Sequence, residues 1–117
     1  MKVIINDNIF KSKVCNTVDS IKDGMMNKTF QGFDCMLFMM PEKAEQSFWM
    51  YDCLILLDII MVDGNVITKI HSNCDPCDDK YNCKSYKGFG DKVVELPGGT
   101  CKKLGIKEGD IVRTSLF

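Results

Sequence analysis

Short apolar runs separated by turn residues make up most of this 117-residue chain. Runs rich in β-branched and other apolar residues are typical of short β-strands. Such strands are predicted near residues 3–5, 9–14, 35–40, 55–62, 65–70, 92–96 and 111–114. Two windows near 17–25 and 99–104 have helical spacing and capping residues instead, so each predicts a short helix. Pro41 is expected to end the strand at 35–40 because proline has no backbone N–H group.

Asp63-Gly64 is the strongest local signal, since it lies between two β-branched runs. Glycine accepts the positive φ of a tight hairpin turn, so strands 55–62 and 65–70 should pair antiparallel. The whole pattern predicts a mainly β fold in one domain over residues 1–117, a small β-sandwich or partly closed barrel with one or two short helices. We expect the core to include Leu37, Phe38, Trp49, Leu56, Ile59, Met61, Val94, Leu96 and Ile111.

Composition narrows the function classes. Fifteen basic and sixteen acidic side chains give a net charge of -1, so the chain lacks the basic field that binding to nucleic acid or an anionic membrane requires. No apolar run approaches the length of a membrane span, and the first residues do not have the pattern of a signal peptide. We therefore expect a cytoplasmic protein. Its cysteines should be mostly reduced, because seven cysteines cannot all pair within one chain.

An aromatic segment is the first candidate site. Phe48, Trp49, Met50 and Tyr51 precede Asp52 within a predicted strand region. These side chains can simply fill the core, as aromatic and methionine residues mostly do. The alternative is that Trp49 and Tyr51 form the wall of a shallow pocket for a small ligand or a protein partner. Its polar contacts would then come from Asp52, and from Asp58 or Glu95, two acids placed within apolar strands.

The polar segment 71–90 is the second candidate site, and it contains the only histidine of the chain. The spacing His71-x2-Cys74-x2-Cys77-x5-Cys83 offers four ligands that suit tetrahedral zinc. Free thiols, or two of these cysteines oxidised together, are the alternative to a metal. A thioredoxin-like use of Cys74 and Cys77 lacks the expected strand-to-helix context, and the neighbouring aspartates would raise the thiol pKa values.

Eight short motifs occur in the order found in one family, and the chain resembles that family over about residues 16–114. The motifs are Gly24-Met25-Met26, Met36-Leu37-Phe38, Phe48-Trp49-Met50, Leu57-Asp58-Ile59, Gly64-x-Val66, Cys83-x-x-Tyr86, Val94-Glu95-Leu96-Pro97-x-Gly99 and Gly105-Ile106-Lys107-x-Gly109-Asp110. The family is domain of unknown function 192, an uncharacterised ancient conserved region. The resemblance implies a compact, mostly β fold. It also shows a departure, because family members usually have Asn-Thr where this chain has Asp52-Cys53.

Two function classes are consistent with these patterns. The chain shows neither a Ser/His/Asp arrangement nor a phosphate-binding glycine loop. We therefore favour a non-enzymatic binding or accessory domain that uses the aromatic strand and the Cys-rich loop. The alternative is a zinc-binding or thiol-redox protein centred on His71, Cys74, Cys77 and Cys83.

Overall fold

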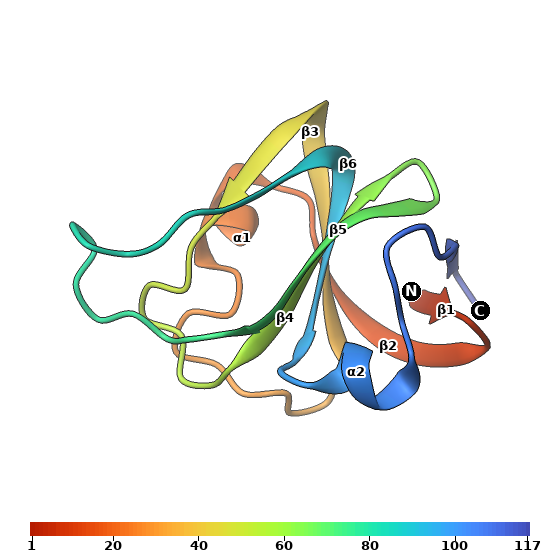
Figure 1. Ribbon diagram of the computed structural model, residues 1–117, viewed down its shortest axis with the longest axis horizontal. Coiled ribbons are helices and arrows are strands. Elements are labelled where there is room, and N and C mark those ends of the chain that lie inside the picture. Colours follow the sequence, from red (N-terminus) through yellow and green to blue (C-terminus); the bar gives the residue numbers. More distant parts are fainter.

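Seven strands and two short helices make up the computed structural model, which describes residues 1–117 (Figure 1). Along the chain these are β1 (Lys2–Ile5), β2 (Asn8–Cys15), α1 (Val18–Asp23), β3 (Cys35–Phe48), β4 (Leu57–Asp63), β5 (Val66–Cys74), β6 (Tyr86–Pro97), α2 (Thr100–Leu104) and β7 (Val112–Ser115). The strands form one sheet in the order β5-β4-β6-β3-β2-β1-β7. The only parallel pair is β2 with β3, and α1 lies in the connection between them.

The two edges of this sheet approach each other. Val66 at the start of β5 forms an isolated antiparallel bridge with Ile111, just before β7. Backbone hydrogen bonds support it: Ile67 N donates to Asp110 O at 3.0 Å, and Val112 N donates to Asn65 O at 2.7 Å. The curled sheet is therefore a half-barrel that is joined across its opening at one point. The predicted mainly β fold is confirmed, and so is the pairing of the strands around Asp63-Gly64.

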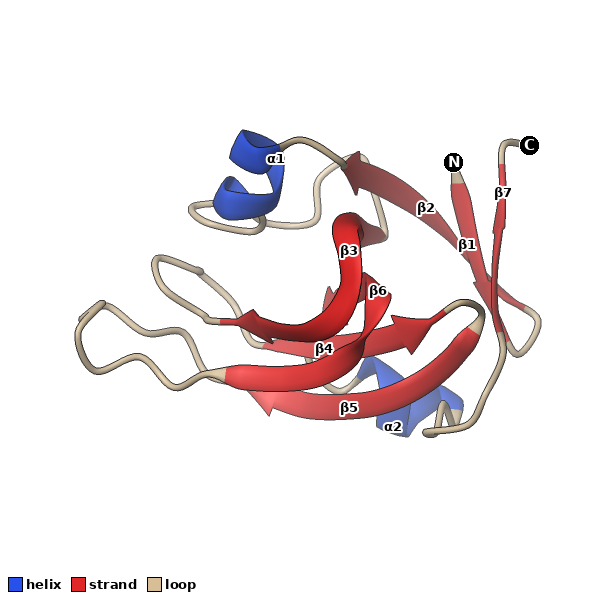
Figure 2. Cartoon of the chain, turned by 90° about the horizontal axis from the view of Figure 1, so that it is seen from above, coloured by secondary structure: helices blue, strands red, loops and turns tan.

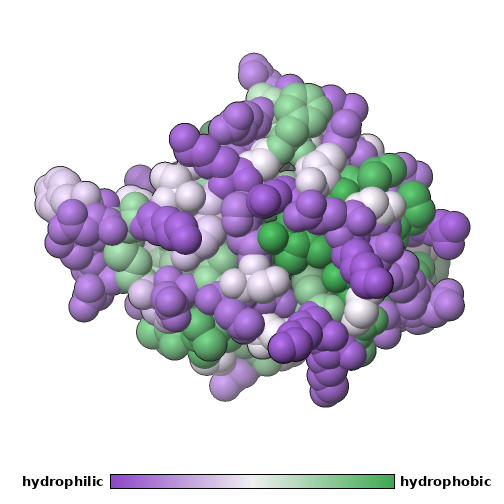
Figure 3. All heavy atoms as spheres, viewed as in Figure 1, coloured by the Kyte–Doolittle hydropathy of each residue, from purple (hydrophilic) through white to green (hydrophobic).

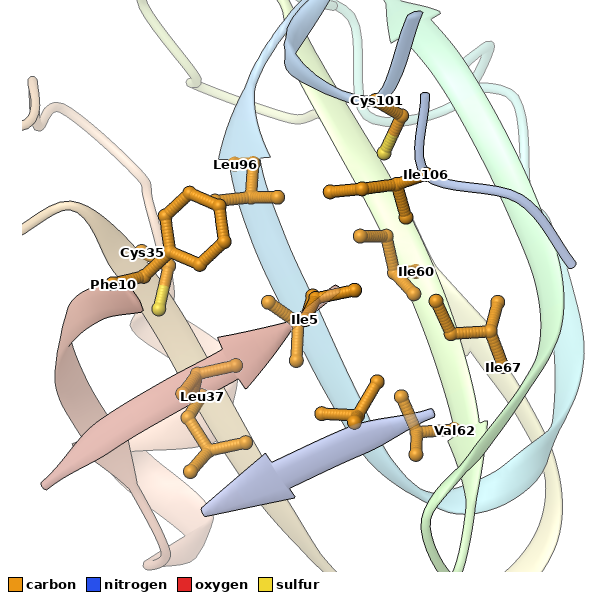
Figure 4. Packing of buried hydrophobic residues seen from close by; sticks show 13 residues of the cluster. Ile5, Phe10, Cys35, Leu37, Ile60, Val62, Ile67, Leu96, Cys101 and Ile106 are labelled. Carbon is orange, nitrogen blue, oxygen red and sulfur yellow. The ribbon is translucent and has the colours of Figure 1, made fainter. Parts of the chain in front are cut away.

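The central strands are buried on both faces, and alternation divides their side chains between two cores. One core lies inside the half-barrel, where Cys35, Leu37, Ile60, Val62, Val94 and Leu96 meet residues of β1, β5, α2 and β7 (Figure 4). The other covers the opposite face with Met36, Phe38, Ile59, Met61 and Val93. The helices lie on opposite sides of the sheet (Figure 2). Cys101 of α2 joins the first core, and Ile21 of α1 packs against the second.

Both short helices were predicted, and capping residues mark the start of α1 and the end of α2. The Thr17 hydroxyl accepts a hydrogen bond from Ser20 N at 3.1 Å, and Thr17 N donates to the Ser20 hydroxyl at 3.0 Å, which completes a capping box for α1. Helix α2 ends at Gly105, whose φ of 69° is favourable for glycine. Neither helix is long and apolar enough to cross a membrane.

Three local expectations were wrong. Pro41 does not end β3, because a bulge between Met39 and Ala44 lets the strand pass through proline and resume pairing with β6. The polar loop is shorter than 71–90, since β5 continues to Cys74 and β6 begins at Tyr86. Finally, three expected core residues are substantially exposed: Trp49, Leu56 and Ile111.

Candidate functional site

A cavity of about 180 Å³ opens beside the second core, between α1 and the segment that follows β3. Helix α1 and the residues after it supply one side of the cavity, including Lys22, Asp23 and Met25. The segment after β3 supplies another side, and the sheet supplies the floor. Residues from four separate stretches of the chain therefore meet here: 21–26, 38–40, 47–53 and Glu95.

Glu95 is the only group of the sheet floor that carries a formal charge when ionised. It lies on β6 opposite Met36 of β3 and Ile59 of β4, so apolar side chains flank it on both neighbouring strands. The residue is 3% exposed, and its carboxyl group makes no hydrogen bond and no ion pair within the chain. Burial alone raises the pKa of Glu95 to about 8, because the charged form loses water and gains no partner.

Four aromatic rings line the cavity: Phe38, Phe48, Trp49 and Tyr51. Phe38 and Phe48 meet edge to face with ring centroids 4.8 Å apart. The rings of Trp49 and Tyr51 are 5.1 Å apart, and Trp49 is 40% exposed, which places it at the boundary between the cavity and solvent. Trp49 and Tyr51 therefore lie together at this cavity.

Asp52, in contrast, does not line the cavity. It occupies a tight turn with a φ of 56°, a conformation that Asn and Asp adopt more readily than most residues. Its backbone connects three segments, since Asp52 N donates to Cys77 O at 3.0 Å and Asp52 O accepts from Asn27 N at 2.8 Å. Asp52 therefore serves this chain through its backbone turn, and its side chain takes no part in the cavity.

Asp58, the other acid of the apolar strands, has a structural role on the opposite face. It is fully buried, and its carboxylate accepts three backbone hydrogen bonds. Its Oδ1 accepts from Asn73 N at 2.9 Å and from Gly99 N at 3.1 Å, and its Oδ2 accepts from Cys101 N at 2.9 Å. The side chain thereby holds the start of α2 against β4 and β5.

The four proposed zinc ligands do not gather around one point. Cys77 and Cys83 form a disulfide with their Cα atoms 5.7 Å apart. Cys74 is buried with its thiol 3.4 Å from His71 O, and His71 Nε2 lies 2.7 Å from Lys87 O. No group of three or more His, Cys, Asp or Glu side chains is arranged to hold a metal ion. The loop therefore has the oxidised arrangement that was the alternative to a metal, while the other cysteines of the chain are free thiols.

The loop that carries this disulfide, residues 75–85, protrudes at the left of Figure 1. Its surface is mostly hydrophilic (Figure 3). The loop is nevertheless attached to the wall of the cavity, because Cys77 N donates to Met50 O at 3.1 Å and Tyr51 forms an isolated parallel bridge with Cys77. The aromatic segment and the Cys-rich loop, which are separate candidate sites in the sequence, are therefore neighbours in the structure.

Comparison with known proteins identifies the family. The family model DUF192, described as an uncharacterised ancient conserved region, matches residues 1–114. This chain belongs to the DUF192 family. No curated protein matches it.

Two solved structures are similar to this DUF192 chain. A protein of unknown function from Novosphingobium aromaticivorans is 30% identical, with a TM-score of 0.85 over 97% of this chain and 84% of that one. A protein of Sinorhizobium meliloti, proposed to be a transcription regulator, is 22% identical, with a TM-score of 0.83 over 96% of this chain and 89% of that one. The second likeness shows the fold alone.

Only part of this DUF192 site was recognisable in the sequence. Trp49 and Tyr51 stood out as an aromatic pair, and Glu95 stood out as one of two acids inside apolar strands. Phe38, Met25 and Cys53 were not expected at the site. No local signal marks them, because they reach the cavity only when α1, β3 and the 50–53 turn come together.

Proposed function

We propose that this DUF192 chain is a non-enzymatic, small-molecule-binding domain and that the cavity above Glu95 is its ligand site. The observation that carries the proposal is a carboxyl group that is almost fully buried, has no partner in the chain and lines a cavity. A buried acid without a partner destabilises the folded state. A ligand that supplies the missing partner would offset that cost.

The other groups of the cavity favour binding over catalysis. The pKa of the Cys53 thiol is raised to about 12, first by burial and then by the negative charges of Glu95 and Asp52. That thiol is protonated at neutral pH and is a poor nucleophile. The cavity therefore combines one buried acid, Glu95, with mostly apolar walls, while the exposed Lys22 and Asp23 lie at its mouth. None of these groups forms the paired nucleophile and base that covalent catalysis uses.

The size of the cavity limits the ligand. Sites for drug-sized molecules usually enclose roughly 300–1,000 Å³. The cavity of about 180 Å³ is smaller, so it suits a compact molecule with one polar end. The polar end would meet Glu95, and the apolar part would lie against the aromatic and methionine side chains.

Trp49 makes the proposal directly testable, because it is the only tryptophan of the chain and it lines the cavity. Four probes with four carbon atoms each are titrated while Trp49 emission is recorded: n-butylammonium, n-butanol, butyramide and butyrate. We expect a saturable change with at least one probe, and Tyr51→Ala should weaken it. Tyr81→Ala is the control, because Tyr81 is 85% exposed in the 75–85 loop. Saturable binding by none of the four probes would overturn the proposal.

A second candidate function follows from the Cys77–Cys83 disulfide and its attachment to Tyr51. We propose that this pair acts as a thiol–disulfide switch that responds to a small-molecule disulfide or dithiol. Exchange with a disulfide oxidant would join the two thiols and release the oxidant as two thiols. The reverse exchange with a dithiol would open the loop.

The switch is tested by titrating the oxidised protein with dithiothreitol and glutathione disulfide while free thiols are counted. Reversible exchange of two thiols, lost in Cys77→Ser, supports the switch. If the disulfide stays intact at reducing potentials of the cytosol, the switch is wrong. Zinc binding by the same loop would first require this disulfide to be reduced.

A further inference from the structure

We propose that the natural ligand of the Glu95 cavity is a small aliphatic ammonium cation, with its charged nitrogen at the Glu95 carboxylate and its carbon chain against the aromatic wall. This inference rests on the proposed binding function and adds the chemical class of the ligand. Three features of the cavity support this inference. Its acid has no cationic partner, no lysine or arginine lies over its aromatic rings, and apolar side chains surround both.

The first feature is that no cation of the chain neutralises Glu95. Lys22 and Asp23, both exposed on α1, lie at the mouth of the cavity and carry opposite charges. Lys28 is the other nearby cation, and its Nζ donates to Gly24 O at 2.8 Å. Neither lysine bonds to Glu95. An ammonium ligand would provide both the positive charge and the N–H donors that this carboxylate lacks.

The second feature is the set of aromatic rings. Elsewhere in the chain, lysines lie over rings: Lys13 is 5.7 Å from the Phe33 centroid, and Lys84 is 5.4 Å from that of Tyr86. No lysine or arginine of the chain lies over the four rings of the cavity in this way. Ring faces attract cations, and an enclosed set of rings is a common recognition site for alkylammonium groups. The cavity therefore offers unused cation–π surface next to an unused carboxylate.

The third feature is the apolar lining, which restricts the rest of the ligand. Met25, Met26 and Met40 complete the wall beside the rings. A second polar group on the ligand would lose water against these side chains without gaining a partner. A carboxylate ligand would in addition meet the negative charge of Glu95. A monoamine with a short hydrocarbon chain satisfies each part of the cavity.

Such binding must depend on pH in a characteristic way. The pKa of Glu95 is about 8, so the cation must displace a proton from the carboxyl group at neutral pH. Affinity should therefore rise about tenfold with each unit of increasing pH up to about 8 and then level off, while the ammonium itself stays protonated below about pH 10. The nearby thiols do not titrate in this pH range and so do not affect the pH dependence of binding. Burial raises the pKa of Cys53 to about 12 and that of Cys74 to about 11, and it also raises the pKa of Cys15.

The test uses the same four four-carbon probes and Trp49 emission at pH values from 6 to 9. We expect n-butylammonium to bind at least tenfold more tightly than n-butanol or butyramide at pH 8, with the pH dependence given above, and butyrate to bind least. Glu95→Gln should remove the preference for the cation while n-butanol binding persists. Glu45→Gln is the matched control, because Glu45 is exposed on β3 and does not line the cavity.

The outcomes separate this inference from the binding function on which it rests. If butanol or butyramide binds as tightly as n-butylammonium or more tightly, the ligand is not a cation. The proposal that the cavity is a binding site would still hold. A preference for the cation that survives Glu95→Gln would also overturn the inference of a cationic ligand. Binding by none of the probes would overturn both. Retained n-butanol binding shows that Glu95→Gln is folded.

Discussion

Asp58 and Glu95 lie on the adjacent strands β4 and β6 and carry their carboxyl groups to opposite faces of the sheet. In the register, Asp58 is paired with Leu96, and Glu95 is paired with Ile59. Both acids are buried, yet Asp58 accepts three backbone hydrogen bonds and Glu95 accepts none. One acid is therefore part of the folded framework, and the other lines a cavity without a partner in the chain.

Asp58→Asn should destabilise the protein by about 2–4 kcal/mol. An amide nitrogen cannot accept a hydrogen bond, so at least one of the three backbone N–H groups loses its partner in a buried site. Urea denaturation at pH 7 measures the effect. A midpoint equal to that of the parent protein would contradict the structural role of Asp58.

Glu95 should make the protein less stable as pH rises. Its pKa is about 8 in the folded chain, against 4.5 as the ordinary value, so between these values the folded state holds a proton that the unfolded state releases. The free energy of unfolding should therefore fall between about pH 4.5 and 8, by at most about 1.4 kcal/mol per pH unit from this group. Glu95→Gln should remove that part of the slope. Parallel pH profiles for parent and variant would refute the assignment.

Phe38→Ala should cost about 3–5 kcal/mol, because Phe38 is 1% exposed and its ring packs against Phe48 and Gly24. Leu56→Ala is the comparison, and it should cost much less because Leu56 is 44% exposed. Chemical denaturation of both variants gives the difference. Equal losses would show that the core is wrongly placed.

Reduction of the Cys77–Cys83 disulfide should loosen the wall of the cavity locally. The bond closes a short loop and contributes about 2 kcal/mol in the chain-entropy view. The amide hydrogens of Asp52 and Cys77 should exchange faster after reduction, because both are bonded across the contact between the loop and the turn. Amides in the centre of β4 serve as the internal reference. Unchanged amide exchange at Asp52 and Cys77 would show that the disulfide does not stabilise the wall of the cavity.

Gly90→Ala should be strongly destabilising, by several kcal/mol. A Cβ atom at this position would overlap the backbone carbonyl group of Val62 on β4. On its other side, Gly90 pairs with Ala44 of β3, directly after the bulge of β3. Gly32→Ala is the control, because a Cβ there meets no other atom and only the positive φ opposes it, at roughly 1 kcal/mol. Thermal unfolding of the two variants distinguishes overlap from backbone strain.

Elements that depend on neighbouring residues could be predicted from the sequence. The Asp63-Gly64 turn specified a hairpin, and the capping residues specified α1 and α2 near their observed ends. Alternation and apolar runs specified a mainly β class, because side chains of a strand must divide between two faces. The error at Pro41 marks the limit of such local information, since whether a bulge accommodates proline depends on the partner strand β6.

The site, in contrast, depends on contacts between distant segments. Trp49 and Tyr51 had two interpretations in the sequence. Asp52 was the first candidate for a polar contact, with Asp58 or Glu95 as further candidates. The curl of the sheet and the position of α1 determine which acid lies in a cavity and which accepts backbone hydrogen bonds. Burial, and with it the raised pKa of Glu95, arises from residues that are distant in the chain, so no local pattern encodes it.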